Sequence, residues 1–164
     1  MRFVVRIVGI LAVVAATAGL FMPATPSDAA SGEAAIKARI DLMRKDVLQN
    51  WKPITAYAKE GKGSPADVAR HAKALSAAAA KIPALFPKGT ARGDFPDKVT
   101  RALPAIWTDW AGFEKATKAL VDESAKLSKI ADGGDKSAIV KQIGMTGKNG
   151  CGGCHKPFRG AKVK

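Results

Sequence analysis

In four successive segments of this chain, the apolar residues recur at the spacing of amphipathic α-helices. The segments cover about residues 32–60, 64–82, 109–131 and 135–158. In the first, apolar side chains three, four or seven positions apart share one helix face: Ile36, Ile40, Met43, Val47 and Ile54. The alternating β-branched runs typical of strands are missing from the sequence. Four such helices with three connections predict an all-α fold, an antiparallel up-down-up-down four-helix bundle.

Local signals set the expected ends of these helices. Ser64, Pro65 and Asp67 supply an N-cap, a proline at the first helical position and an acid in the first turn, so the second helix should begin there. Pro53 lies inside the first segment and predicts a kink or a new turn. Residues 83–103 contain glycine and proline and form a long irregular connection. Loops of this length often wrap a ligand.

The N-terminal residues have the pattern of a secretory leader. Arg2 and Arg6 supply positive charge before an apolar, uncharged stretch that runs from Ile7 to Met22. Small residues follow, and we expect cleavage after Ala29, so that residues 1–29 are a signal peptide and 30–164 form one domain. An uncleaved membrane anchor is less favoured, because a spanning helix needs about 20 apolar residues. We therefore expect export to the periplasm without stable membrane insertion.

The chain is strongly basic, with a formal net charge of +13 at pH 7. Its lysines are spread along the whole sequence, without the aromatic and basic cluster typical of nucleic-acid binding. Nucleic acid is therefore not an expected partner. We interpret the charge mainly as solvated helix faces, with an acidic protein partner as the second interpretation.

Two cysteines and a histidine near the C-terminus form the most specific chemical motif, Cys151-Gly-Gly-Cys154-His155. On a helix of about 3.6 residues per turn, these three side chains fall within an arc of about 100°. Two thiols on one face can add to the two vinyl groups of a haem, and the adjacent imidazole can bind the iron. The motif predicts one covalent haem c per chain, with Cys151 and Cys154 as attachment points and His155 as the proximal axial ligand.

Two other uses of this motif are disfavoured. A thioredoxin-like redox pair is expected between a strand and a helix, with the cysteines opening the helix. Here the motif lies at the end of the last helical segment. A structural zinc site needs four ligands, and His71 is the one additional histidine that could join the three residues of the motif.

Four stretches of sequence carry a wider resemblance. They are Ala38 to Met43, Ile82 to Pro87, Leu103 to Trp107, and Cys151 to Arg159. Together they resemble the first helix, the segments joining helices two and three, and the haem helix of the cytochrome c-prime (c′) family, the class II c-type cytochromes. The resemblance covers about residues 35–159, and a haem motif near the C-terminus is itself distinctive of this class.

The resemblance implies roles for further residues. Arg39 corresponds to a first-helix arginine that approaches a haem propionate, and charge-assisted bonds of this kind are strong. Met43 corresponds to the position over the distal face of the haem, so the chain resembles the family members with a distal methionine. Phe86, Trp107 and Phe158 are expected to pack against the haem or in the core. Family members often pair through their first two helices, which makes a homodimer compatible with the sequence.

Met43 separates the two functions that the family implies. If its sulfur binds the iron, His and Met ligation suits one-electron transfer with a redox partner protein. If Met43 only packs nearby, an open distal site favours small gases such as nitric oxide. Met145 is a rival ligand only in principle, because it lies on the haem-bearing segment. An enzyme such as a peroxidase is not expected, because the first segment offers no acid-base pair beside Met43.

Overall fold

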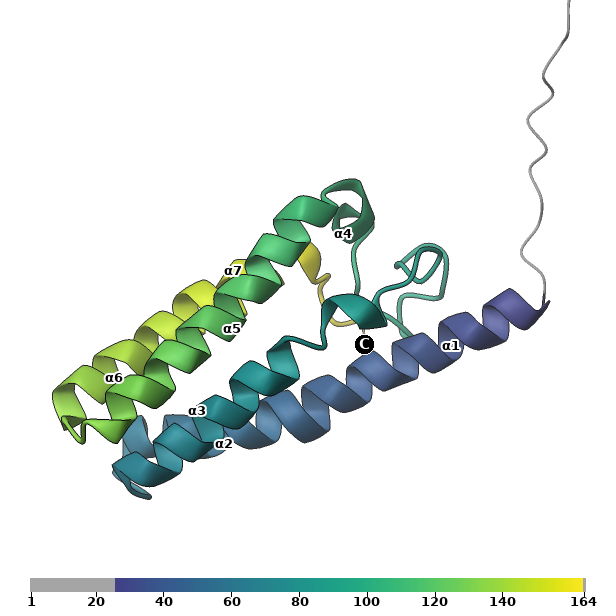
Figure 1. The fold of residues 1–164 in the computed structure, drawn as a ribbon. Coiled ribbons are helices and arrows are strands. Elements are labelled where there is room, and N and C mark those ends of the chain that lie inside the picture. The colour runs from purple at the N-terminus through teal and green to yellow at the C-terminus, as the bar shows by residue number, and fades with distance from the viewer. Residues whose placement is uncertain (1–25, 164) are drawn as a thin grey trace, which may run out of the picture.

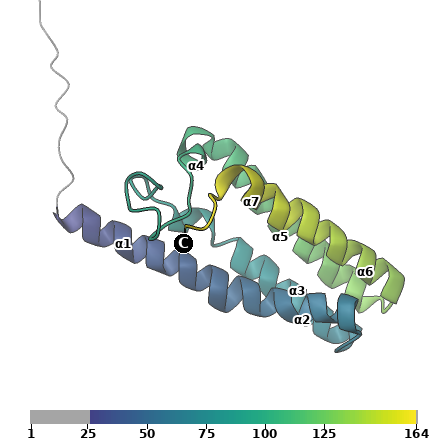
Figure 2. The ribbon, with the colours of Figure 1, turned by 180° about the vertical axis from the view of Figure 1, so that it is seen from behind.

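The computed structural model describes residues 26–163, and helices form its regular structure (Figures 1 and 2). The first long helix consists of α1 (Pro26–Asp41), the π-helical turn η1 (Leu42–Val47) and α2 (Leu48–Glu60). The second is α3 (Pro65–Ala79), followed by the 3₁₀ turn η2 (Pro83–Leu85). The short α4 (Ala105–Thr108) precedes the third long helix, α5 (Trp110–Asp132). The last consists of α6 (Lys136–Met145), the π turn η3 (Thr146–Cys151) and α7 (Gly152–Phe158).

These elements confirm the predicted all-α four-helix bundle, and their order is consistent with the up-down-up-down topology. Helix α3 packs along α5, α2 packs on α3, and η3 packs on α5. In Figures 1 and 2 the pair formed by α1–α2 and α3 diverges from the pair formed by α5 and α6–α7. They diverge towards the end that carries α4 and the C-terminus. None of the helices within residues 26–163 is long and apolar enough to cross a membrane.

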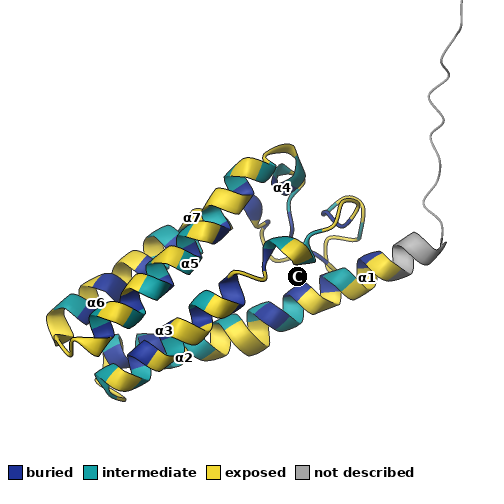
Figure 3. Ribbon diagram, viewed as in Figure 1, coloured by how far each residue is buried: buried dark blue, intermediate teal, exposed yellow. Residues whose placement is uncertain are grey.

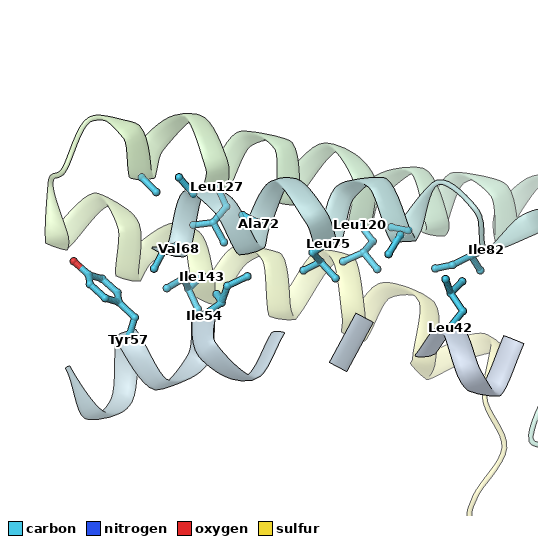
Figure 4. Packing of buried hydrophobic residues seen from close by; sticks show 14 of the residues in the cluster. Leu42, Ile54, Tyr57, Val68, Ala72, Leu75, Ile82, Leu120, Leu127 and Ile143 are labelled. Atoms are coloured by element: carbon cyan, nitrogen blue, oxygen red, sulfur yellow. The ribbon is translucent and has the colours of Figure 1, made fainter. Parts of the chain in front are cut away.

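Apolar side chains from all four helices fill the interior along most of the bundle (Figures 3 and 4). Ile54, Leu75 and Leu127 have no measurable solvent exposure. Burying a side chain of this size contributes about 1.5–3 kcal/mol of transfer free energy. The helical periodicity read from the sequence therefore marks the real core. Its larger members include Leu42, Val68, Ile82, Leu120, Ile139 and Ile143.

The predicted start of the second helix is confirmed as a capping box. The backbone N–H of Asp67 donates to the Ser64 hydroxyl at 3.1 Å. The backbone N–H of Ser64 donates to the Asp67 carboxylate at 3.1 Å. Two backbone donors at the helix N-terminus are thereby satisfied, and Pro65 occupies the position where no donor is needed.

The first helix differs from its expected form in two places. It continues through Pro53, which lies inside α2, and its irregular turn lies upstream at η1. There the backbone N–H of Leu48 donates to the carbonyl of Met43, five residues back, which is the π-helical pattern. The helix also begins earlier than expected, at Pro26. The predicted leader lies outside the described residues up to position 25, and the cleavage after Ala29 stays a prediction.

A carboxylate on α5 holds the last helical segment in place. Glu123 accepts hydrogen bonds from Gln142 on α6 at 2.5 Å and from Asn149 on η3 at 2.9 Å. The two donors lie on either side of Thr146, whose hydroxyl is fully buried and donates to the carbonyl of Gln142. This clamp supports a glycine-rich stretch with poor intrinsic helix propensity.

Gly150 allows that stretch to lie very close to α5. A Cβ atom at Gly150 would meet the Cδ1 atom of Leu120 at 2.8 Å and its Cα atom at 3.1 Å. The Leu120 Cα belongs to the backbone of α5, so it cannot turn away as a flexible side chain could. At Gly144, by contrast, an added Cβ would meet no atom within 4 Å. Of these two glycines, close packing therefore requires only Gly150.

We predict that Gly150→Ala lowers the free energy of unfolding by about 1–3 kcal/mol, because the added methyl group overpacks the contact with Leu120. Gly144→Ala is the matched control. It should raise stability by up to about 1 kcal/mol, because alanine is the better helix former and the site has space. Urea-induced unfolding followed by circular dichroism measures both. Equal effects of the two substitutions would contradict the close approach at Gly150.

Candidate functional site

A hollow of about 540 Å³, open to solvent, lies at the diverging end of the bundle. Its lining comes from α1, η1, the residues between α3 and η2, the connection between η2 and α4, and the helices α4, α5 and α7. The residues are Arg39, Met43, Ile82, Phe86, Arg101, Ala102, Ile106, Phe113, Cys154, His155, Phe158 and Arg159. A smaller hollow of about 340 Å³ shares four of them: Met43, Ile82, Cys154 and His155. The two hollows therefore adjoin.

This place brings together all five residues singled out from the sequence. Arg39 lines the larger hollow, Cys151 lines the smaller, and Met43, Cys154 and His155 line both. Met43 comes from η1 in the first helix, whereas the cysteines and the histidine come from η3 and α7 in the last. Side chains more than a hundred positions apart thus reach one site.

The two cysteines form the apolar end of the site. They are free thiols, half-buried beside Val47 and Leu120. Burial raises the pKa of Cys154 to about 11, and the neighbouring Cys151 adds to the effect. Burial also raises the pKa of Cys151. Both side chains therefore stay neutral near pH 7 and suit an apolar partner.

His155 lies where its ring is kept neutral. Although the residue is exposed at its outer side, the protein around the ring partly desolvates it and lowers its pKa, and the positive charges of Arg159 and Arg101 lower the pKa further. A neutral imidazole has a nitrogen lone pair for a metal ion, which an imidazolium lacks. The local electrostatics therefore suit His155 as an iron ligand.

Arg39 is buried, with 4% of its surface exposed, and it fixes the connection that closes the site. Its guanidinium donates to the Thr90 hydroxyl at 2.8 Å, to the Thr90 carbonyl at 2.6 Å and to the Thr100 hydroxyl at 2.6 Å. It also lies over the Phe86 ring, 4.7 Å from the centroid. Burial lowers its pKa to about 10, so it stays charged near pH 7. Arg39 thus joins α1 to a segment more than fifty residues away.

Aromatic rings form one wall of the larger hollow. Phe86 lies 4.9 Å from Phe113, and Phe113 meets Phe158 edge-on at 5.5 Å between centroids. Trp107, also expected near the haem, does not line either hollow. Its indole N–H donates to the backbone carbonyl of Phe86 at 3.1 Å. Trp107 therefore supports Phe86, whose ring lines the larger hollow.

The two ends of the site differ in charge. Arg39, Arg101 and Arg159 line the larger hollow, and no aspartate or glutamate is among the described residues that line either one. The cysteine end is apolar. This polarity fits a flat apolar ring system that carries acidic groups on one edge, as haem does. The available ligands, an imidazole and a thioether, are those that bind haem iron.

Several site residues carry no signal in the sequence that places them at the site. Arg101, Thr90 and Thr100 belong to the irregular connection, where no periodicity indicates which way a side chain points. Gly150 indicates only weak helix propensity in the sequence, because a close contact with another helix leaves no local pattern.

The remaining sequence-based candidates lie elsewhere. His71 on α3 shares a hydrogen bond of 3.0 Å with Asn50 and does not line either hollow. Met145 is 40% exposed at the end of α6. Within residues 26–163, no three histidine, cysteine, aspartate or glutamate residues are grouped to hold a metal ion.

Replacing Arg39 by lysine should lower the free energy of unfolding by about 2–3 kcal/mol, since lysine cannot reproduce the fork that bonds Thr90 and Thr100. The connection 86–102 should then be cleaved faster in limited proteolysis. Arg70→Lys is the control, because Arg70 is exposed and pairs only with Asp67 nearby. Unchanged stability and proteolysis in Arg39→Lys would show that the buried guanidinium does not hold the connection.

Comparison with known proteins agrees with this site. The family model described as cytochrome C′ matches residues 34–159. Cytochrome c′ of Rhodospirillum rubrum is 38% identical over 120 residues, which cover 71% of this chain and 78% of the relative. Cytochrome c-554 of Cereibacter sphaeroides is 36% identical over 143 residues, covering 84% and 88%.

Solved structures show the same fold. Cytochrome c′ from Rubrivivax gelatinosus superposes with a TM-score of 0.66 at 26% identity, covering 78% of this chain and 96% of that one. A variant of cytochrome c′ from Alcaligenes xylosoxidans in complex with nitric oxide gives 0.68 at 28% identity, covering 80% and 97%. The match over nearly all of the described residues identifies this chain as a member of the cytochrome c′ family, c-type cytochromes with a covalently bound haem c.

Proposed function

We propose that this chain is a periplasmic monohaem cytochrome that transfers single electrons, with Met43 and His155 as the two axial ligands of the iron. The observation that carries the proposal is the position of these two residues. Met43 and His155 each line the larger and the smaller hollow, although Met43 comes from the first helix and His155 from the last. A flat group between them would have one ligand on each face.

The cysteines supply the covalent attachment in this proposal. Cys151 and Cys154 would hold the haem, since each thiol could add across one vinyl group, with the S–H bond and the vinyl π bond replaced by a C–S and a C–H bond. Their half-buried, neutral state at the apolar end suits the hydrocarbon part of such a ring. Arg39, at the opposite end, would pair with a propionate through those of its guanidinium N–H groups that are not bonded to Thr90 or Thr100.

Axial ligation by His and Met raises the reduction potential of a haem and suits electron transfer. The protein's part is to hold the imidazole neutral and to keep the thioether in place. His155 is kept neutral by partial desolvation and by two arginines. Met43 packs against the core from η1. Such π turns recur at functional sites, because they re-aim a side chain within a helix.

The lining of the site supports binding and electron transfer rather than catalysis. Peroxidase-type chemistry needs a second acid-base group on the face opposite the proximal ligand. Among the described lining residues, His155 is the one histidine, and none is a carboxylate. We therefore propose that the protein is not an enzyme.

The predicted leader and the basic charge complete the proposal. An exported chain fits the periplasm, where a redox partner with an acidic surface would be attracted to a strongly basic protein. The similar proteins named above come from bacteria. A homodimer is compatible with this function.

Gas binding is the second candidate, and specific neighbours favour it. Variants of cytochrome c′ from Alcaligenes xylosoxidans have been solved with bound nitric oxide and with bound carbon monoxide. If Met43 packs beside the iron without binding it, the same hollow would accept a diatomic gas. The state of Met43 thus decides between the two functions.

Optical spectra of the oxidised and reduced protein test this choice. We predict a low-spin spectrum for the wild type and a high-spin spectrum for Met43→Ala, with the haem still covalently attached in both, because the substitution removes only the distal ligand. Met145→Ala is the matched control: Met145 is exposed, so its spectrum should equal that of the wild type.

A high-spin wild-type spectrum would overturn the proposal of Met ligation and leave gas binding as the function. A low-spin spectrum that survives in Met43→Ala would show that another residue is the distal ligand.

A further inference from the structure

Arg101 is a charged residue at the site to which neither the sequence nor the family comparison assigns a role. It lies in the connection before α4, is half-buried, and lines the larger hollow together with Arg39. Its Nε–H donates to the carbonyl of Gly160 at 2.8 Å. The backbone N–H of Gly160 donates in return to the carbonyl of Arg101, also at 2.8 Å. One edge of the guanidinium is therefore fixed to the segment that follows α7.

The other edge of this guanidinium remains available. Within residues 26–163, the two terminal nitrogens of Arg101 make no hydrogen bond or ion pair to another residue. Among the described residues that line the hollow there is no carboxylate to neutralise it. A half-buried arginine held in one orientation, with two donors directed away from its anchor, is suited to a carboxylate on a ligand.

Arg39 cannot meet the whole need of a ligand with two carboxylates. Both donors of its Nη2 are used, one by the Thr90 carbonyl and one by the Thr100 hydroxyl, and one donor of Nη1 is used by the Thr90 hydroxyl. What remains is one Nη1 donor and the Nε–H, which do not lie side by side on one edge of the guanidinium, so Arg39 can offer a carboxylate a single bond from either. A haem has two propionates on the same edge, and the second needs another partner at this end of the hollow.

Arg159 is the other cation at this end, but its geometry is less suitable. It is exposed at the end of α7, and its side chain makes no hydrogen bond within the described part of the chain. Its contribution is a positive field, which also lowers the pKa of His155.

We propose that Arg101 binds the second propionate of the haem and that Arg39 and Arg101 together fix the edge of the ring opposite Cys151 and Cys154. This inference rests on the proposed function, because it takes the haem to lie between Met43 and His155. In this arrangement the vinyl edge faces the thiols and the acidic edge faces the two arginines. The polarity of the hollow thus selects one orientation of the ring.

The test measures the reduction potential of the full-length holoprotein between about pH 5 and pH 9, a range above the ordinary pKa of a carboxyl group. In the wild type both propionates are paired and stay ionised, so they add no pH dependence. Arg101→Gln removes one partner and raises the pKa of that propionate into the range. The potential should then fall as pH rises through this pKa, because the newly ionised carboxylate favours ferric iron.

Two further substitutions separate pairing from a general effect of charge. Arg159→Gln removes an equal charge at the same end and should lower the potential evenly, without a new pH step. At alkaline pH both variants should shift the one-electron equilibrium by up to about tenfold, which is about 59 mV. Arg101→Lys keeps the positive charge, so its reduction potential should show no new pH step. Arg70→Gln changes an exposed residue that lines neither hollow and should match the wild type.

The proposal is overturned if Arg101→Gln shows no new pH step, or if Arg159→Gln shows the same one. Should Arg101→Gln not accumulate as holoprotein, ¹³C resonances of propionate-labelled haem in the wild type give the same answer. Both carboxyl groups should stay ionised above about pH 5, and one that titrates there contradicts the pairing. A chain without covalent haem under denaturing conditions would instead be a failure of the proposed function.

Discussion

The contact of Gly150 with α5 determines where the reactive residues of this protein lie. The backbone of η3 approaches the Leu120 Cα so closely that a side chain at position 150 would overpack the contact. Cys151 follows directly, and Cys154 and His155 lie one turn further along α7. The clamp from Glu123 to Gln142 and Asn149 holds the same segment from its other side. The positions of the thiols and the imidazole are therefore set by α5.

The opposite side of the site is held by a buried charge. Arg39 projects from α1 and bonds Thr90 and Thr100, so the irregular connection follows the first helix. That connection brings Phe86 and Arg101 to the hollow. Removing one partner of such a buried network leaves polar groups unpaired, which costs far more than the net contribution of a single surface bond. The guanidinium of Arg39 thus combines this structural role with the ligand-binding role proposed for it.

The sequence predicts the parts of this arrangement that have a period or a local signature. The apolar stripe with Ile36, Met43 and Ile54 indicates the first helix, and Ser64 and Asp67 mark the start of the second. Arg39 and Met43, four positions apart, are expected on one helix face, and they do line one hollow. The Cys151 to His155 motif indicates haem because three reactive groups are needed at a fixed spacing.

Other parts have no such signal. A π turn changes which carbonyl each N–H reaches, and no residue type requires it, so η1 and η3 cannot be inferred from the sequence. Pro53 does not end the first helix: α2 runs through it from Leu48 to Glu60. Arg101 lies in an irregular segment, and its direction depends on a bond to Gly160, nearly sixty residues away.

The central claim is that the first and the last helix each provide one ligand to the iron, Met43 and His155. X-ray absorption at the iron edge of the purified holoprotein tests it most directly, because sulfur and nitrogen neighbours scatter differently. We predict one sulfur atom bound to the iron in both the oxidised and the reduced protein. An iron with nitrogen ligands alone would contradict it.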